Sequence, residues 1–319
     1  MSFEVVDLGI RVGAVVLFAA LGLWMLVRPR SWVRWQAGPW LRKYLVVDDP
    51  VARERFVDWQ AGVAVSLGAF NLVGAAGVAV LPFMADPDSL LPAILLPLWL
   101  SLAAAVPVEV LVTARQIERR HPDVPMLARD RKISVEDYTP SGVARLARAV
   151  AGMAGLSGCL GLLAIIGGGL SSTPVSWLWV VCLLAVPLAA GVHGSRSRRL
   201  VALSEPAADE ATRYWQDAQR AGAIRSGWDR VVLAGTFPLL MGPMSLWGEF
   251  DRSWHGGVAF AVGTALTLGA LTMLVGQLVL QLAWPGMRWT RRRLWPDLPE
   301  GWLVYREPVT GAASGGDAS

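Results

Sequence analysis

Long runs of uncharged apolar residues, separated by short connections that carry the charges, are the dominant feature of this sequence. Each run holds about 17–25 residues, which is the length that crosses ~30 Å of hydrocarbon as a helix. Apolar residues make up 54% of the 319 and charged residues only 17%, compared with about 25% charged in a soluble domain. The sequence therefore predicts an all-α, polytopic helical membrane protein.

We predict about seven transmembrane helices, which together form one transmembrane domain over residues 1–283. Their expected positions are near 8–27, 61–81, 89–114, 149–170, 175–193, 231–247 and 257–282. The sixth span is the shortest, and Pro238 and Pro243 are expected to interrupt it, since proline removes a helical hydrogen bond.

The basic residues predict the orientation of these spans. Of 29 arginines and lysines, 27 lie in the connections 28–60, 115–148 and 194–230 and in the tail from residue 288. Every second connection is therefore basic, and basic connections face the cytoplasm. This pattern predicts an outside N-terminus and a cytoplasmic C-terminus.

The amino-acid usage also indicates the kind of source organism and the membrane in which the protein lies. Only Lys43 and Lys132 are lysine, while arginine, alanine, glycine and valine are abundant. We interpret this usage as the codon bias of a high-GC bacterium, and expect the cytoplasmic (inner) membrane. The spacing of the basic residues matches membrane topology and not a nucleic-acid-binding patch, so no nucleic-acid partner is expected.

Two cytoplasmic segments mix tryptophan with arginine, the composition of segments that lie amphipathically in the headgroup layer. One is 31–44 and the other is the tail 284–310; the end, 311–319, is expected to be disordered. Anionic lipid headgroups are their expected partners, with an unidentified membrane or cytoplasmic protein as the alternative. The predicted anchors are Trp32, Trp35, Trp40, Arg42, Trp289, Arg291, Arg292, Arg293 and Trp295.

Pro206–Arg220 has an apolar stripe and a separate polar face, which predicts a surface helix. The start of this segment resembles the segment that precedes the second span. In both 49–60 and 205–216, an acidic residue, a proline, a glutamate and a Trp-Gln pair follow one another at the same spacing. Two explanations stay open: a duplication that relates the first three spans to the last three, or a coincidence between helix starts.

Glu109 is the carboxylate placed well inside a predicted span, two residues after Pro107. An acid beside a broken helix is typical of proton and cation pathways. The alternative is that Glu109 reaches the interface or pairs with a cytoplasmic arginine. Asn71, Gln277 and Gln281 are further pathway candidates, although such amides also serve as hydrogen-bonding contacts between helices.

The sequence predicts no catalytic residue, cofactor or metal site. Ser157 and His255 are expected at different depths, so they do not form a serine-protease pair. No span contains a lysine for retinal, no P-loop is present, and Cys159 and Cys182 lack the spacing of a zinc or redox motif. We therefore expect a non-enzymatic protein, either a small transporter or permease-like unit or the membrane subunit of an assembly. An acid-dependent intramembrane enzyme and a purely structural or docking protein are the alternatives.

Overall fold

The computed structural model describes residues 3–44, 50–80, 99–118, 133–168, 172–203, 210–253, 256–283 and 288–297. Within these ranges the chain is helical apart from short turns and links, and has no strand. The all-α prediction is therefore confirmed for this part of the chain. The helices are α1 (Phe3–Val27), α2 (Pro29–Lys43), α3 (Pro50–Val80), α5 (Val108–Glu118), α6 (Val135–Tyr138), α7 (Ser141–Ile166), α8 (Pro174–Ala202), α9 (Glu210–Ser253), α10 (Gly256–Ala283) and α11 (Arg288–Leu294).

Five helical segments in the described ranges are long and apolar enough to cross a membrane, and six if the bent pair of α1 and α2 counts as one span. The five are Arg53–Gly77, Trp99–Ile117, Ser141–Ile166, Ser176–Ala202 and Thr264–Ala283. This confirms several membrane-compatible helices, while the count of seven stays a prediction. The loop at 82–88 and the first part of the third predicted span, 89–98, lie outside the described residues.

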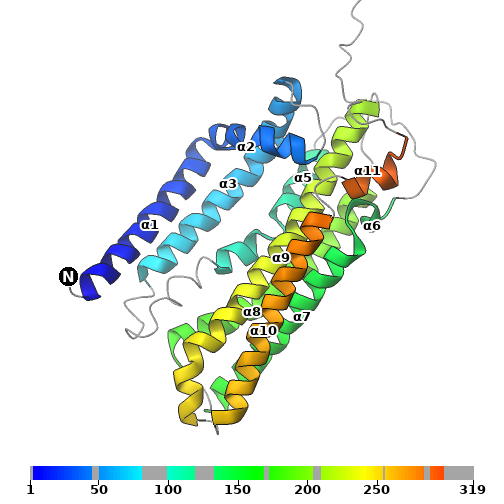
Figure 1. Ribbon diagram of the computed structural model, residues 1–319. Coiled ribbons are helices and arrows are strands. Elements are labelled where there is room, and N and C mark those ends of the chain that lie inside the picture. The colour runs from blue at the N-terminus through cyan, green and yellow to red at the C-terminus, as the bar shows by residue number, and fades with distance from the viewer. Residues whose placement is uncertain are drawn as a thin grey trace, which may run out of the picture.

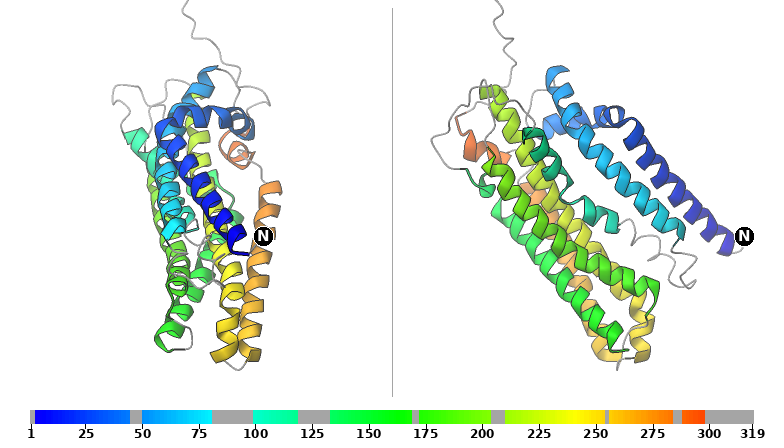
Figure 2. Two further views of the ribbon diagram at one scale, coloured as in Figure 1. Left: turned by 90° about the vertical axis from the view of Figure 1, so that its left-hand side faces the viewer. Right: turned by 180° about the vertical axis from the view of Figure 1, so that it is seen from behind.

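The helices form a bundle with a two-helix unit beside it. Figure 1 shows α7, α8, α9 and α10 packed side by side, with α1 and α3 forming a separate pair, and Figure 2 shows the same arrangement from behind. Helix α1 contacts α2 and α3, whereas α5 contacts α3, α8 and α9. The α5 helix therefore connects the two-helix unit to the bundle.

Helix α2 lies across the end of α1, because the chain bends by 95° between them. Pro29 occupies the first turn of α2, where its missing N–H leaves no hydrogen bond unmade. On the exposed side, Arg30 pairs with Asp58 of α3 at 2.9 Å and Arg34 pairs with Glu54 at 3.2 Å. The opposite side buries Val33, Ala37, Gly38 and Leu41. The apolar face of α2 therefore packs against the rest of the protein.

Helix α9 is the central element, and its 44 residues span about 66 Å. It packs against α5, α6, α7, α8 and α10, and every residue from Tyr214 to Arg225 is buried. The prediction of a surface helix at Pro206–Arg220 is therefore wrong: its described part, 210–220, is the first quarter of α9 and is buried from Tyr214 onward. The reason is that neighbours cover its polar face as well as its apolar stripe.

Proline does not interrupt α9. The helix continues through Pro238 and Pro243, contrary to the sequence expectation. At Pro238, the backbone carbonyl accepts a hydrogen bond from the indole N–H of Trp179 on α8 at 2.9 Å. This bond ties α9 to α8 beside the proline.

Candidate functional site

The third predicted span is broken close to its acidic residue. Residues 99–105 are helical, Val106 and Pro107 form a turn, and α5 begins at Val108. Proline has no N–H, so the carbonyl of Ala103 instead accepts from the N–H of Val106 at 3.2 Å. The turn therefore separates two consecutive helical segments of one membrane-compatible span, Trp99–Ile117.

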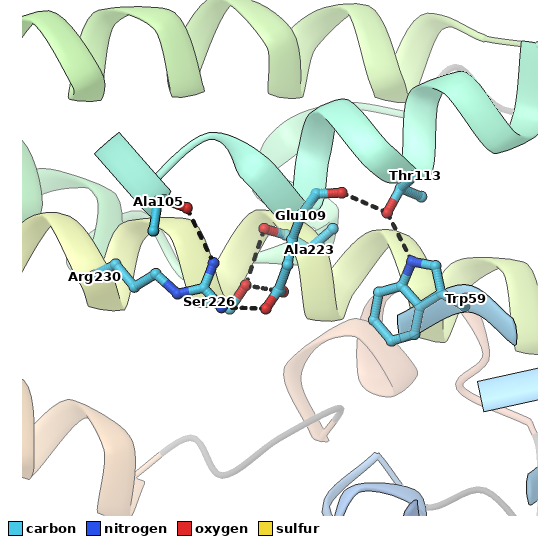
Figure 3. Close-up of polar contacts among 7 residues, drawn as sticks. All are labelled: Trp59, Ala105, Glu109, Thr113, Ala223, Ser226 and Arg230. Atoms are coloured by element: carbon cyan, nitrogen blue, oxygen red, sulfur yellow. Dashed lines mark hydrogen bonds and ion pairs between the residues drawn. The ribbon is translucent and has the colours of Figure 1, made fainter. Parts of the chain in front are cut away.

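Glu109 lies in that first turn, and its carboxylate faces α9. It forms an ion pair with Arg230 and accepts a hydrogen bond from the hydroxyl of Ser226 (Figure 3). The guanidinium of Arg230 also donates to the carbonyl of Ala105, at 3.3 Å. We call these four groups the Glu109 site: the Glu109 carboxylate, the Arg230 guanidinium, the Ser226 hydroxyl and the Ala105 carbonyl.

The two charges of the Glu109 site are largely removed from solvent. The side chains are 9% exposed for Glu109 and 17% exposed for Arg230. A buried charge is stable only when it is paired and hydrogen-bonded, and removing one partner of such a pair typically costs about 3–5 kcal/mol. Its partner, Arg230, lies 121 residues further along the chain and is the last residue of the basic connection 194–230. The ion pair therefore matches the alternative in which Glu109 pairs with an arginine of a connection predicted to be cytoplasmic.

A second polar cluster lies on the neighbouring face of α9. The amide of Gln277 on α10 donates to the carboxylate of Asp229, while the Gln277 carbonyl oxygen accepts no hydrogen bond from any described residue. Burial raises the pKa of Asp229 above its ordinary value, and the charge of Arg225 opposes that shift. Asp229 stands two residues before the predicted sixth span.

Tyr44, which ends α2, lies within electrostatic range of both clusters. Burial raises the pKa of its phenol well above the ordinary value, the carboxylates of Glu109 and Asp229 reinforce the shift, and Arg225 and Arg230 oppose it. Five titratable or charged groups from three helical elements therefore meet around the middle of α9.

His193, the last residue of the fifth predicted span, is a further buried group. Its side chain is fully buried between α8 and α9, and its Nε2 lies 3.0 Å from the carbonyl oxygen of Ile224. The ring packs edge-on against Trp228, with centroids 4.8 Å apart, and Gly227 provides the space it fills. Within the part of the chain that the structure describes, its Nδ1 has no hydrogen-bond partner.

The structure brings together some of the predicted pathway residues and separates others. Gln277 bonds Asp229, and Gln281 lies close enough to influence the same carboxyl group. Asn71 instead contacts the sulfur of Met25 at 3.5 Å, between α3 and α1. The contact of Asn71 is therefore of the kind that joins two helices.

The predicted interfacial tryptophans of the first segment have different surroundings. Trp35 is 74% exposed, whereas Trp32 is half-buried against Trp24 and Trp35. Trp40 packs into the protein, in contact with four aromatic rings at centroid distances of 4.4 to 5.7 Å. These rings belong to Tyr44, Phe56, Trp59 and Trp215. Trp59 and Trp215, which occupy equivalent positions in the similar segments 49–60 and 205–216, therefore both contact the ring of Trp40.

The C-terminal segment is folded onto the bundle. Trp295 donates its indole N–H to Asp217 at 2.8 Å, and the Tyr138 hydroxyl donates to the other oxygen of the same carboxylate, also at 2.8 Å. Trp289 donates to the carbonyl of Glu136 at 2.8 Å, so the tail also binds α6. We call Tyr138, Asp217 and Trp295 the tail contact. Arg42, Arg292 and Arg293 are exposed, as anchors for anionic lipid would be.

No group of three or more His, Cys, Asp or Glu side chains that could hold a metal ion occurs among the described residues. No family model, no curated protein and no solved structure matches the chain.

Proposed function

We propose that this chain is a seven-span membrane protein with its N-terminus outside the cell and its C-terminus in the cytoplasm. We further propose that it is a small transporter or permease-like unit in which the Glu109 site responds to protons. The observation that carries the proposal is the buried ion pair of Glu109 and Arg230 at a break in a membrane-compatible helix.

The positions of the connections support this topology. In Figure 1, α2, α6 and α11 lie at one end of the molecule, and the N-terminus lies toward the other. The first of these ends carries the basic segments 28–44 and 288–293, whereas the turn between α7 and α8 contains no basic residue. This distribution agrees with basic segments in the cytoplasm.

The chemistry of the Glu109 site supports a transport role. Broken helices place backbone carbonyls and ionisable side chains inside a membrane, where transporters use them to bind ions and protons. Protonation of Glu109 would break the ion pair and leave the Arg230 charge without its partner, which favours a rearrangement of α5 against α9. A bistable contact of this kind is what couples proton binding to a conformational change.

An intramembrane enzyme is the alternative that one contact favours, since the hydroxyl of Ser226 bonds a carboxylate. The same carboxylate is, however, ion-paired with Arg230, so it is not free to act as the base that a serine nucleophile needs. A membrane subunit of an assembly or a structural bundle would use the same ion pair for stability alone.

Reporter fusions test the topology. A reporter fused after Tyr44, Lys132 or Ser319 is expected to be cytoplasmic, and one inserted at Pro87 or Ser172 external. Lys132, Pro87 and Ser319 lie outside the described residues. A cytoplasmic signal at Pro87 would contradict the seven-span arrangement.

Proton flux tests the transport role. Purified protein is reconstituted into liposomes that contain a pH-sensitive dye, and a potassium diffusion potential drives proton entry. We expect flux in the wild type and its loss in Glu109→Gln, with Glu54→Gln as the matched control because Glu54 forms an exposed ion pair. Equal flux in Glu109→Gln and wild type would exclude Glu109 from the pathway; a folded but inactive wild type would favour a structural role.

A further inference from the structure

The oxygen atoms around Arg230 have the composition of a monovalent-cation site. They are the carboxylate of Glu109, the hydroxyl of Ser226 bound to it, and the carbonyl of Ala105. Hard cations bind to such oxygen ligands, and carbonyls at the C-terminal end of a half-helix contribute to Na⁺ sites in membrane proteins. In this chain the helical segment 99–105 ends at that carbonyl.

We propose that Arg230 is a tethered cation that occupies a site for a monovalent cation built from Glu109, Ser226 and Ala105. This inference rests on the proposed function and deepens it. Its consequence is that the natural protein needs no Na⁺ or K⁺ at this position, because the guanidinium supplies the positive charge. Without Arg230, the same oxygens bind an external Na⁺ or K⁺.

The local charges support a monovalent ligand. Glu109 is the carboxylate that bonds Arg230, so the oxygen site has a charge of −1 when Arg230 is removed. Asp229 on the adjoining face is bonded by Gln277 and lies near Arg225. The other groups in electrostatic range are Lys43 and Tyr44 at the end of α2 and His193 on α8. None of these adds a second carboxylate to the Glu109 site.

The site is not completely enclosed by the described residues. The Arg230 side chain is 17% exposed. Truncation of Arg230 leaves the space of a guanidinium next to a buried carboxylate. A buried carboxylate without a partner becomes protonated or binds a cation, and at alkaline pH protonation is disfavoured.

Thermal unfolding of the full chain in detergent tests the inference. Arg230→Ala and Arg230→Gln are titrated with NaCl or KCl at alkaline pH, with N-methylglucamine chloride holding the ionic strength constant. We expect the unfolding midpoint of both variants to rise by about 2–4 °C with Na⁺ or K⁺. The wild type should not respond, because its site is filled. The double variant Glu109→Gln/Arg230→Gln should also lose the response.

The control is Arg34→Ala, which breaks an exposed ion pair with Glu54 and should show no cation-specific response. Identical curves in Na⁺, K⁺ and N-methylglucamine for Arg230→Gln would overturn the inference. So would a cation response that survives in the double variant, since the ligand would then bind elsewhere. This measurement is independent of transport, so flux that depends on Glu109 together with no cation response would remove the cation site and keep the proposed function.

Discussion

The indole N–H of Trp59 donates to the hydroxyl of Thr113 at 2.9 Å, and that hydroxyl donates to the backbone carbonyl of Glu109 at 2.7 Å. All three residues are buried. This chain of hydrogen bonds, drawn in Figure 3, joins the two-helix unit of α1 and α3 to the helix that carries the Glu109 carboxylate. A movement of α3 would therefore act directly on the first turn of α5.

Thr113→Val is expected to lower the free energy of unfolding by about 1–3 kcal/mol, because it leaves the buried Trp59 N–H without an acceptor. Thr113→Ser is the matched control, since it keeps the hydroxyl and should be nearly neutral. Chemical unfolding in detergent measures both variants. If Thr113→Val were as stable as Thr113→Ser, the hydrogen bond from Trp59 would contribute nothing to the stability of the contact between α3 and α5.

The sequence was sufficient to find Glu109 but not its partner. A carboxylate two residues after a proline in an apolar run stands out because burying a charge is costly. Arg230 carried no such signal, since it falls among the basic residues that precede the sixth predicted span and was counted with the cytoplasmic connection. The spacing of Ser226 and Arg230, four residues apart and so on one face of a helix, was the available clue.

The position of α9 shows a second limit of sequence analysis. The periodicity around Tyr214 and Asp217 correctly indicated a helix with two distinct faces, but it could not show that both are covered. Tyr138, far away in the sequence, binds Asp217, and Trp295 covers the same carboxylate. The local sequence pattern does not show contacts between residues that are so far apart in the chain. The helix was therefore predicted correctly, but its position at the surface was not.

Gly227→Ala is expected to destabilise the protein strongly, by about 1–3 kcal/mol or more, because the added methyl group would overlap the ring of fully buried His193. Gly191→Ala is the matched control, since its methyl group would meet no atom within 4 Å. Thermal unfolding compares the two. The effect of Gly227→Ala should shrink in a His193→Ala background, and an undiminished effect there would mean that the ring is not the obstacle.

Trp295→Phe is expected to loosen the C-terminal segment, since it removes one of the two hydrogen bonds to Asp217 in the tail contact. A loss of about 1 kcal/mol would make α11 open roughly fivefold more often. Hydrogen exchange of peptides that contain Arg291–Arg293 measures this opening. Trp35→Phe, on a ring that is 74% exposed, should leave the exchange unchanged; equal exchange in both variants would contradict the proposed role of the contact.

The buried phenol of Tyr214 is expected to make the folded protein less stable at alkaline pH. Burial raises the pKa of its phenol to about 12, compared with 10.0 for the ordinary group. Because the folded pKa is the higher one, the unfolded chain loses its proton first as the pH rises. The contribution of Tyr214 is therefore complete below pH 10 and is lost progressively up to about pH 12. Tyr214→Phe should weaken this decline in the unfolding midpoint, and parallel curves for the two proteins would argue against it.

The two cysteines provide a matched pair for testing how the bundle packs. Cys182 is buried, 1% exposed, whereas Cys159 is exposed on the surface of α7. Both lie in membrane-compatible helices, so in intact cells we expect neither to react with a charged, membrane-impermeant thiol reagent. In detergent, a small neutral maleimide should modify Cys159 readily and Cys182 only on unfolding, because a buried thiol forms the reactive thiolate with difficulty. Cys159→Ser and Cys182→Ser variants, followed by intact mass, assign each modification.

Rapid labelling of Cys182 by the charged reagent in cells would mean that water reaches the contact between α8 and its neighbours. A water-filled path through the bundle would then run beside α9, and the packed arrangement of α7, α8 and α9 would describe only one of its states.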